Sequence, residues 1–358
     1  MSQLEKVFAV NRKGLDLPLG AAVTGILAVT WVVIDQTNQE KYFITAVFAV
    51  LLTCLCDPGG DYSNRLLRMA AVGVIGALIT ALGFYVGGLA WGYGVLCLFV
   101  LTLLSGLAVK FGVHSFLSGT LLNVWFIITL ILPAGFHAAR LPVHEWDQAL
   151  AWLIGSAAWI AFTCIAWLAS GLNRRPPPVV ELPGDGGPVP LTRPVIFFAV
   201  IRAVAVAGSA AIALGTHQPN ADWMPLATLV AIKPSLAQTR LVSVQRLIGT
   251  ALGGLVAIPI LVAVDNKHAL EWIIIILAVI GVTIQGVNYA YYTAAMAGAA
   301  LIAVDLPHPT NYAAEGRRVL FTFIGVGIGV IVMFIADLLG KRSAKKGVTG
   351  GSGRTTAA

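Results

Sequence analysis

Three cationic side chains, Lys233, Arg240 and Arg246, lie between two apolar runs of the sequence. Lys233 precedes Pro234, and a proline biases the residue before it away from the helical conformation, so we expect one helix to end here. A short amphipathic helix should follow, and a further helix should open at Arg246. Cations at two such helix ends, together with the helix dipole, can bind an anion. The alternative is that they only hold a loop at the membrane surface.

Small and hydroxyl-bearing residues follow Arg246. Gly249, Gly253 and Gly254 form one face at roughly one-turn spacing, which would let another helix backbone approach closely. Thr250 lies one turn beyond Arg246 and can hydrogen-bond its own backbone or a solute. We therefore take Arg246, Gly249 and Thr250 as candidate substrate-binding residues, and the other two glycines as packing residues.

A second candidate group lies in the run "QGVNYAYYTAAMAG". On a helix Asn288, Tyr291 and Tyr292 share one face, with Tyr289 one step away. Their rings could stack on an aromatic acid, and their hydroxyl groups could donate hydrogen bonds to its carboxylate. Ordinary helix packing would use the same residues.

Few polar side chains fall inside or beside the apolar segments, and their rarity makes each a candidate. His114 could couple transport to protons, because histidine titrates near neutral pH, or it could be an interfacial histidine bonded to a carbonyl group. Asp305 and Glu315, at the outer ends of two segments, could accept protons or belong to a solvated loop. Asn123 and Trp125 are candidates for substrate contact, although a buried amide more often joins two helices.

The composition is typical of a protein that crosses a membrane many times. Apolar residues make up 58% of the 358 residues, charged residues only 11%, and the mean hydropathy is +0.86. A soluble domain carries about 25% charged residues. The net charge of +7 is dispersed over short loops, which argues against nucleic acid as a partner and favours an anionic solute or lipid. All four cysteines fall in apolar segments, so we expect neither disulfide bonds nor a metal site.

Twelve apolar segments approach the length of about 20 residues that a helix needs to cross the hydrocarbon. The second and eighth are short, and could be tilted or incomplete. Apart from Arg202, near the inner end of the seventh, no charged residue lies near the middle of a segment. Lys and Arg are concentrated in the loops on one side, which predicts that both termini are cytoplasmic. The predicted segments are 17–34, 42–56, 66–88, 91–109, 112–133, 148–170, 195–214, 222–233, 246–265, 271–285, 288–305 and 318–339.

A Pro- and Gly-rich stretch divides the chain almost in half and predicts a cytoplasmic linker. Six segments on each side predict two repeats of parallel orientation. "FGVHSF" aligns with "QGVNYA", which sets His114 against Asn288, and Arg68 can be set against Arg246. "HEWDQALAWLIGSAAW" aligns with "AEGRRVLFTFIGVGIG" later in the chain. The predicted domains are a first repeat (1–172), the linker (173–194), a second repeat (195–340) and a basic flexible tail (341–358).

The opening stretch belongs to a longer pattern, W-x-P-L-A-T-L…K-P-S…T-R…Q-R-L-I-G-T-x-x-G-G, which covers residues 223–254. We expect Trp223 at the outer membrane interface, the usual place for an indole ring. Pro225 should fall in the first turn of a helix, where its missing N–H group costs nothing.

This pattern resembles the signature segment of the fusaric acid resistance protein family, the aromatic acid exporters, which are distantly related to plant aluminium-activated malate channels. The resemblance implies proton-driven export of aromatic carboxylates or related anionic toxins across the bacterial inner membrane, often with a periplasmic adaptor protein. The first half keeps only Arg68 and the glycines of the signature, so both halves need not bind substrate. The signature positions here are Trp223, Pro225, Leu226, Pro234, Arg246, Gly249 and Thr250.

We therefore predict an all-helical inner-membrane efflux transporter without a cofactor. An organic anion would enter from the cytoplasm, drawn by Lys233, Arg240, Arg246 and Arg68, and would rest between the halves against Tyr and Trp side chains. An enzyme is not expected, because the chain lacks paired acidic motifs for metal and phosphate and a Ser/His/Asp set. An organic-anion channel and a non-transporting assembly subunit are the alternatives. A homo-oligomer is possible.

Overall fold

The computed structural model describes residues 8–138, 142–171, 190–216, 218, 221–232, 236–306, 317 and 320–336. Within these ranges it leaves out the side chains of residues 113, 134, 135, 138, 236–243, 304 and 305. Every regular element in this part of the chain is a helix, so the predicted all-helical class is confirmed.

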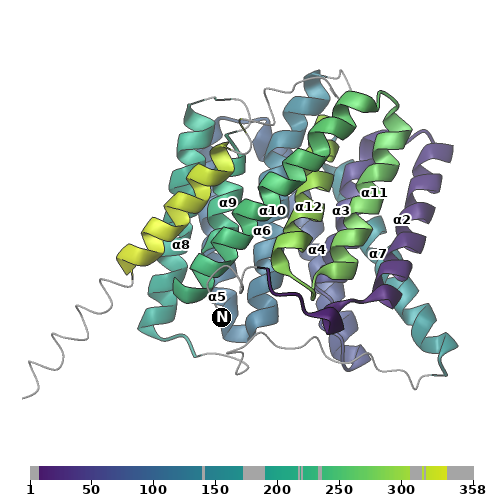
Figure 1. Ribbon diagram of the computed structural model, residues 1–358, viewed down its shortest axis with the longest axis horizontal. Coiled ribbons are helices and arrows are strands. Elements are labelled where there is room, and N and C mark those ends of the chain that lie inside the picture. Colours follow the sequence, from purple (N-terminus) through teal and green to yellow (C-terminus); the bar gives the residue numbers. More distant parts are fainter. Residues whose placement is uncertain are drawn as a thin grey trace, which may run out of the picture.

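The helices follow the predicted segments closely. Figure 1 shows them side by side, with α8 and the helix Leu320–Ala336 (yellow) at one end of the bundle and α2 at the other. The α-helices are α2 (Leu17–Gln36), α3 (Phe43–Leu55), α4 (Tyr62–Gly87), α5 (Trp91–Leu107), α6 (Val113–Ala138), α7 (Glu145–Ala169), α8 (Arg193–Gly215), α9 (Trp223–Ala231), α10 (Leu236–Ala263), α11 (Lys267–Ile284), α12 (Tyr289–Asp305) and Leu320–Ala336. Short 3-10 helices are η1 (Arg12–Gly14), η2 (Glu40–Tyr42) and η3 (Ala108–Phe111).

By length and composition, eight of the described helices can cross a membrane. Helices α3 and α9 have 13 and 9 residues, which correspond to about 20 and 14 Å against a hydrocarbon thickness of about 30 Å. Every residue of α9 and nearly every residue of α3 is buried by the other helices. These are the second and eighth predicted segments, so the expectation that both are short is confirmed.

Helix α10 differs from the expectation. It runs without a break from Leu236 to Ala263, so the predicted short amphipathic helix and the next span are one helix. No Gly or Pro interrupts residues 236–248, and Leu, Ala, Gln and Arg all favour helix. Arg246 therefore lies about three turns inside α10. The prediction that it stands at a helix N-terminus is wrong.

Glycine contacts hold α10 against α12. A Cβ atom at Gly249 would lie 2.5 Å from the Ala290 carbonyl oxygen, and one at Gly253 would lie 2.7 Å from that of Ala294. Only glycine permits so close an approach of two backbones. The predicted small-residue face is therefore confirmed at these two positions, and Gly254 beside them is buried.

Two seams join the first six helices to the last six. At one, α5 packs on α8, with Gly106 against Ala199; at the other, α2 packs on α11, with Gly20 against Thr283. The segment before α2 strengthens the second seam, because backbone hydrogen bonds run from Asn11 to Val287 and from Asp16 to Thr283. The start of α2 and the turn between α11 and α12 therefore lie at the same end of the bundle.

We predict that the α10–α12 contact is intolerant of even a methyl group. Gly253→Ala should destabilise the protein by about 1–3 kcal/mol, because the new Cβ must displace the α12 backbone. The matched control is Gly25→Ala in α2, where a Cβ meets nothing within 4 Å. That change should be neutral or slightly stabilising, since alanine favours helix. Thermal unfolding in detergent measures both, and equal melting temperatures would contradict the prediction.

The loop between α2 and α3 contributes a pH-dependent contact. The Glu40 carboxylate accepts a hydrogen bond from the Lys267 ammonium group at the start of α11, which lowers the pKa of Glu40 below 4.5. This contact stabilises the fold above about pH 4.5 and is lost as the pH falls through the lowered pKa. The melting temperature of Lys267→Met should therefore lie slightly below that of the wild type at pH 7 and converge with it at pH 3. A constant difference across this range would refute the assignment.

Candidate functional site

A cleft of about 360 Å³ lies among α4, α5 and α6. Its walls are mostly apolar, with side chains such as Val72, Ile79 and Leu122. Ile75 of α4 and Leu104 of α5 line it and are also exposed on the outside of the bundle, so the cleft is open sideways between these two helices. Its volume falls in the range of small-molecule sites.

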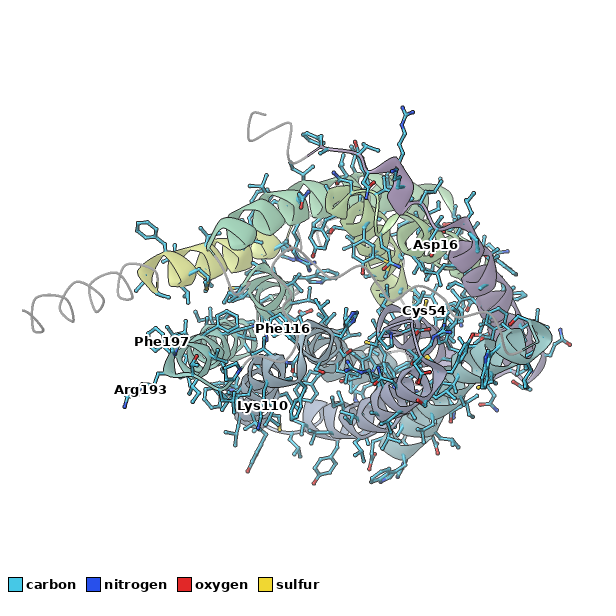
Figure 2. The ribbon with its side chains drawn as sticks, turned by 90° about the horizontal axis from the view of Figure 1, so that it is seen from below. Asp16, Cys54, Lys110, Phe116, Arg193 and Phe197 are labelled. Atoms are coloured by element: carbon cyan, nitrogen blue, oxygen red, sulfur yellow. The ribbon has the colours of Figure 1, made fainter. Side chains whose placement is uncertain are left out.

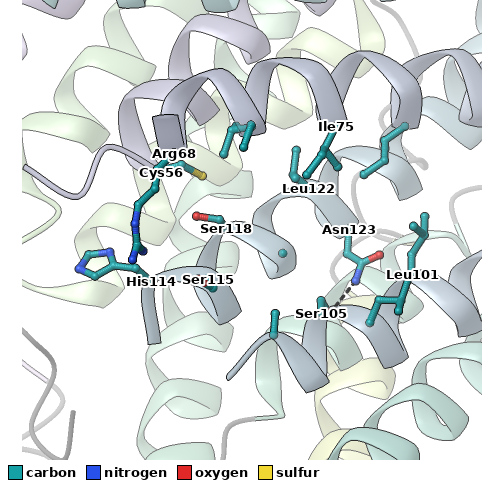
Figure 3. A pocket seen from close by; sticks show the side chains of 16 residues that line it. Cys56, Arg68, Ile75, Leu101, Ser105, His114, Ser115, Ser118, Leu122 and Asn123 are labelled. Carbon is teal, nitrogen blue, oxygen red and sulfur yellow. Dashed lines mark hydrogen bonds between the residues drawn. The ribbon is translucent and has the colours of Figure 1, made fainter. Parts of the chain in front are cut away.

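One end of the cleft is cationic. Figure 3 shows the side chains of Arg68 from α4 and His114 from α6 next to each other, with Ser115 and Ser118 close by. Arg68 is half-buried and donates one hydrogen bond, from Nε to Oδ1 of Asn64 at 3.1 Å. No acidic residue lines the cleft, and no described carboxylate forms an ion pair with Arg68. The structure thus brings together two residues that were selected separately from the sequence.

The other end of the cleft is polar and buried. Asn123 is 1% exposed, and its Nδ2 donates to Oγ of Ser105 at 2.9 Å. Its Oδ1 has no hydrogen-bond partner. The cleft therefore runs from a cationic mouth, along apolar walls, to an amide with a free acceptor.

Arg202 stands directly behind this end. The expectation that it lies near the inner end of its segment is wrong, because α8 begins at Arg193 and places Arg202 near its middle, with 0% exposure. Its Nη1 donates to Oγ of Ser105 at 2.9 Å, and its Nη2 donates to Oγ1 of Thr120 at 2.9 Å. The guanidinium carbon lies 4.7 Å from the centre of the Phe116 ring. Figure 2 places Phe116 of α6, the ring beside Arg202, toward the middle of the bundle. Arg193, which lies on α8 like Arg202, points outward.

A second cluster forms between α10 and α12. The rings of Tyr289 and Tyr292 lie 5.8 Å apart, and Tyr292 interacts electrostatically with Arg246. Thr250 is buried one turn along α10, while the free face of Gly249 is covered by α12. Arg246 and Tyr292, candidates from two parts of the sequence, are therefore neighbours, whereas Gly249 has a packing role.

Two other candidates have structural roles, and a third faces outward. Asn288 caps α12, since its Oδ1 accepts from the Ala290 N–H at 2.7 Å, while its Nδ2 donates to the Ala9 carbonyl oxygen. Trp125 is fully buried, donates to Oγ1 of Thr80 and stacks on other aromatic rings. Tyr291 is 38% exposed on the outside of α12.

The remaining signature residues are only partly described. Trp223 is the first residue of α9 and is buried, so it does not face the interface as expected. Pro225 lies in the first turn of α9, as predicted. Ile232 is extended, so α9 ends just before Lys233-Pro234. The candidates outside the described residues are Lys233, Pro234 and Glu315, together with the side chains of Arg240 and Asp305.

One buried acid was missed by sequence reasoning. Glu271 is 3% exposed in α11; its Oε2 accepts from Nε1 of Trp31 at 2.8 Å and lies 3.2 Å from Nδ1 of His268. It falls at the very edge of a predicted segment, so hydropathy alone gives no sign that it is covered. Among the described residues, no group of three or more His, Cys, Asp or Glu side chains could hold a metal ion.

Comparison with known proteins gives a match within the second half of the chain. Residues 204–332 match the sequence model of a family described as fusaric acid resistance protein-like. This part of the chain is similar to that family. The match runs from α8 into the helix Leu320–Ala336, so the resemblance seen in the signature segment is confirmed, while the relation to plant malate channels stays a prediction. The comparisons with curated proteins and with solved structures found no match.

The cleft itself lies in the first half, outside the segment that matches the fusaric acid resistance protein-like family. The membrane-length helices and the family match indicate a multi-pass membrane protein.

A buried ion pair anchors the loop at the mouth of the cleft. Arg65 donates from Nε and Nη2 to the two carboxylate oxygens of Asp57, at 2.6 and 2.5 Å. Asp57 also accepts from the Gly59 N–H, and Gly59 and Gly60 both adopt positive φ angles. The pair therefore fixes the turn that leads into α4 and hence the position of Arg68.

We predict that Arg65→Gln destabilises the protein by about 3 kcal/mol, because it leaves the Asp57 carboxylate buried without its partner. The double variant Arg65→Gln, Asp57→Asn should recover part of this loss, since no buried charge is left alone. Thermal unfolding measures both. A double variant no more stable than the single one would show that the ion pair is not the cause.

Proposed function

We propose that this protein is an efflux transporter of organic anions, with aromatic carboxylates as the substrate class and the bacterial inner membrane as its location. The observation that carries the proposal is the acid-free cleft with Arg68 and His114 at its mouth. A cation above apolar walls suits a solute with one negative group and an apolar body. The family match supports a transporter rather than an enzyme.

The predicted topology sets the direction of transport. With both termini cytoplasmic, the mouth of the cleft faces the cytoplasm, because Arg68 in the second turn of α4 and His114 in the first turn of α6 lie at the same end as the segment before α2. A cationic mouth there would collect organic anions from the cell interior. His114 is our candidate for proton coupling at this mouth, and Glu271 is a second candidate at the opposite end.

We also propose that the two halves are parallel repeats. Two features support this. The seams form an equivalent pair, since the fourth helix of each half packs on the first helix of the other, α5 on α8 and α11 on α2. In the aligned last helices, Gly155 packs on Ala46 of the short helix α3, and Gly325 packs on Met224 of the short helix α9.

The repeat explains why the cleft is in the first half. With Arg68 set against Arg246, Ala71 and Ile75 of α4 correspond to Gly249 and Gly253 of α10. The glycines let α10 lie directly on α12, whereas the larger side chains at the corresponding positions of α4 line the cleft. The alignment likewise sets tyrosines, Tyr289 and Tyr292, against the serines at the cleft mouth, Ser115 and Ser118.

A flux assay in proteoliposomes tests the function. Wild-type protein should move benzoate along an imposed proton gradient, and Arg68→Gln should slow the flux about ten-fold, because a charge-assisted contact worth at least 1.4 kcal/mol is lost. The matched control is Lys110→Gln, an exposed cation at the same end that does not line the cleft. Its flux should equal the wild type. Equal loss in both variants would mean that surface charge, and not the cleft, matters.

The same vesicles separate the alternatives. A channel would pass net anion current without proton movement, and an assembly subunit would move no solute unless a partner protein is added. Proton-coupled flux by the purified chain alone would exclude both. Its absence would overturn the proposed function.

A further inference from the structure

Three buried polar atoms without hydrogen-bond partners lie around Ser105. They are Oγ1 of Thr102 on α5, Oδ1 of Asn123 on α6 and Nε of Arg202 on α8. Ser105 connects them, because its Oγ accepts from Asn123 and Arg202 and donates to the Thr102 carbonyl oxygen at 3.0 Å. Buried polar groups in native proteins are nearly always paired, so three free atoms around one hydroxyl group mark a network that is incomplete.

The charge in this network is also uncompensated. The groups that accept hydrogen bonds from Arg202 are the hydroxyl oxygens of Ser105 and Thr120 and, at 3.5 Å, the Leu229 carbonyl oxygen; all are neutral. No described carboxylate forms an ion pair with it. The Phe116 ring offers only partial compensation. A guanidinium at this depth in a membrane normally requires an anion or a water-filled cavity.

Ser105 links this guanidinium to the cleft. It lines the deep end together with Asn123, and its oxygen accepts a hydrogen bond from Nη1 of Arg202, which is not among the residues that line the cleft. Because its oxygen already accepts two hydrogen bonds, its own hydrogen is available to a stronger acceptor than the Thr102 carbonyl. To bind a ligand in the cleft, this hydrogen leaves the Thr102 carbonyl oxygen, and the two hydrogen bonds that the Ser105 oxygen accepts shift around it.

We propose that Ser105 forms a carboxylate subsite at the deep end of the cleft, with Arg202 behind it as its countercharge. One carboxylate oxygen accepts from the Ser105 hydroxyl group, while the apolar walls hold the body of the molecule. Arg202 does not touch the ligand and is a positioning residue that acts through Ser105. This inference rests on the proposed function, and it places the anion beyond the Arg68 mouth.

The subsite predicts discrimination between a carboxylate and a neutral group of the same shape. Benzoate and benzamide are suitable probes, measured by isothermal titration calorimetry on the full chain in nanodiscs of zwitterionic phosphatidylcholine, where no lipid carries a net negative charge. The wild type should bind benzoate more tightly than benzamide. Arg202→Gln should weaken benzoate at least ten-fold and leave benzamide unchanged. An anionic lipid in the cleft would instead appear as benzoate binding that falls when phosphatidylglycerol is added to the nanodisc.

The melting temperature gives an independent test, because a purely structural role of Arg202 predicts a change in the opposite direction. Arg202→Gln should keep or raise the melting temperature of the ligand-free protein, because it removes a buried charge that has no counter-ion. If Arg202 only joins helices, the same variant should lower the melting temperature and keep the benzoate preference, which would overturn the subsite. Ser105→Ala is the second variant: it keeps the charge but removes the link, and it should abolish the benzoate preference as well.

The two proposals fail in different ways. If the wild type shows no preference for benzoate over benzamide, or Ser105→Ala retains it, the subsite is wrong even where vesicles loaded with the protein move organic anions. If those vesicles move none, the transport function is wrong whatever the calorimetry shows.

Discussion

Close contact between helix backbones is the interaction on which this bundle depends. In hydrocarbon, lipid tails cover an apolar side chain as well as a neighbouring helix does, so association relies on tight packing and buried hydrogen bonds. Gly253 on Ala294, Gly155 on Ala46 and Gly325 on Met224 are contacts of this kind. They also shelter α3 and α9, which are too short to span the hydrocarbon and would otherwise expose backbone groups to lipid.

The cleft is the place where this close packing is relaxed. Under the proposed repeat, Ile75 of α4 corresponds to a glycine of α10, and the space beside Ile75 runs to a buried amide and to Ser105, which accepts a hydrogen bond from the Arg202 guanidinium. The two halves therefore differ in a way that a few side chains explain. The α10–α12 contact in the half that carries the family signature is closely packed, while the cleft lies in the other half.

Much of the fold could be predicted from the sequence, because lipid imposes length and hydropathy on each helix and both are local properties. The continuous α10 could not, since a cationic stretch between apolar runs favours a loop as readily as a helix. Burial of Arg202 and Glu271 depends on which neighbours cover them, and that is a property of packing. The grouping of Arg68, His114 and Asn123 in one cleft was likewise invisible, although each residue was selected by type. The side chains from Lys233 to Arg240, in the signature stretch, lie outside the described part, so their role in binding an anion stays a prediction.

The segment before α2 helps to hold the two halves of the chain together. Its backbone forms hydrogen bonds with the α11–α12 region. Together with the α2–α11 and α5–α8 seams, these bonds join the halves at both sides of the bundle without using the predicted linker. The two halves therefore do not need the peptide bonds in the middle of the chain to stay together. A protein cut at residues 173–194, or made as two polypeptides, would stay one particle, with its interface formed by the same surfaces that fold the intact chain.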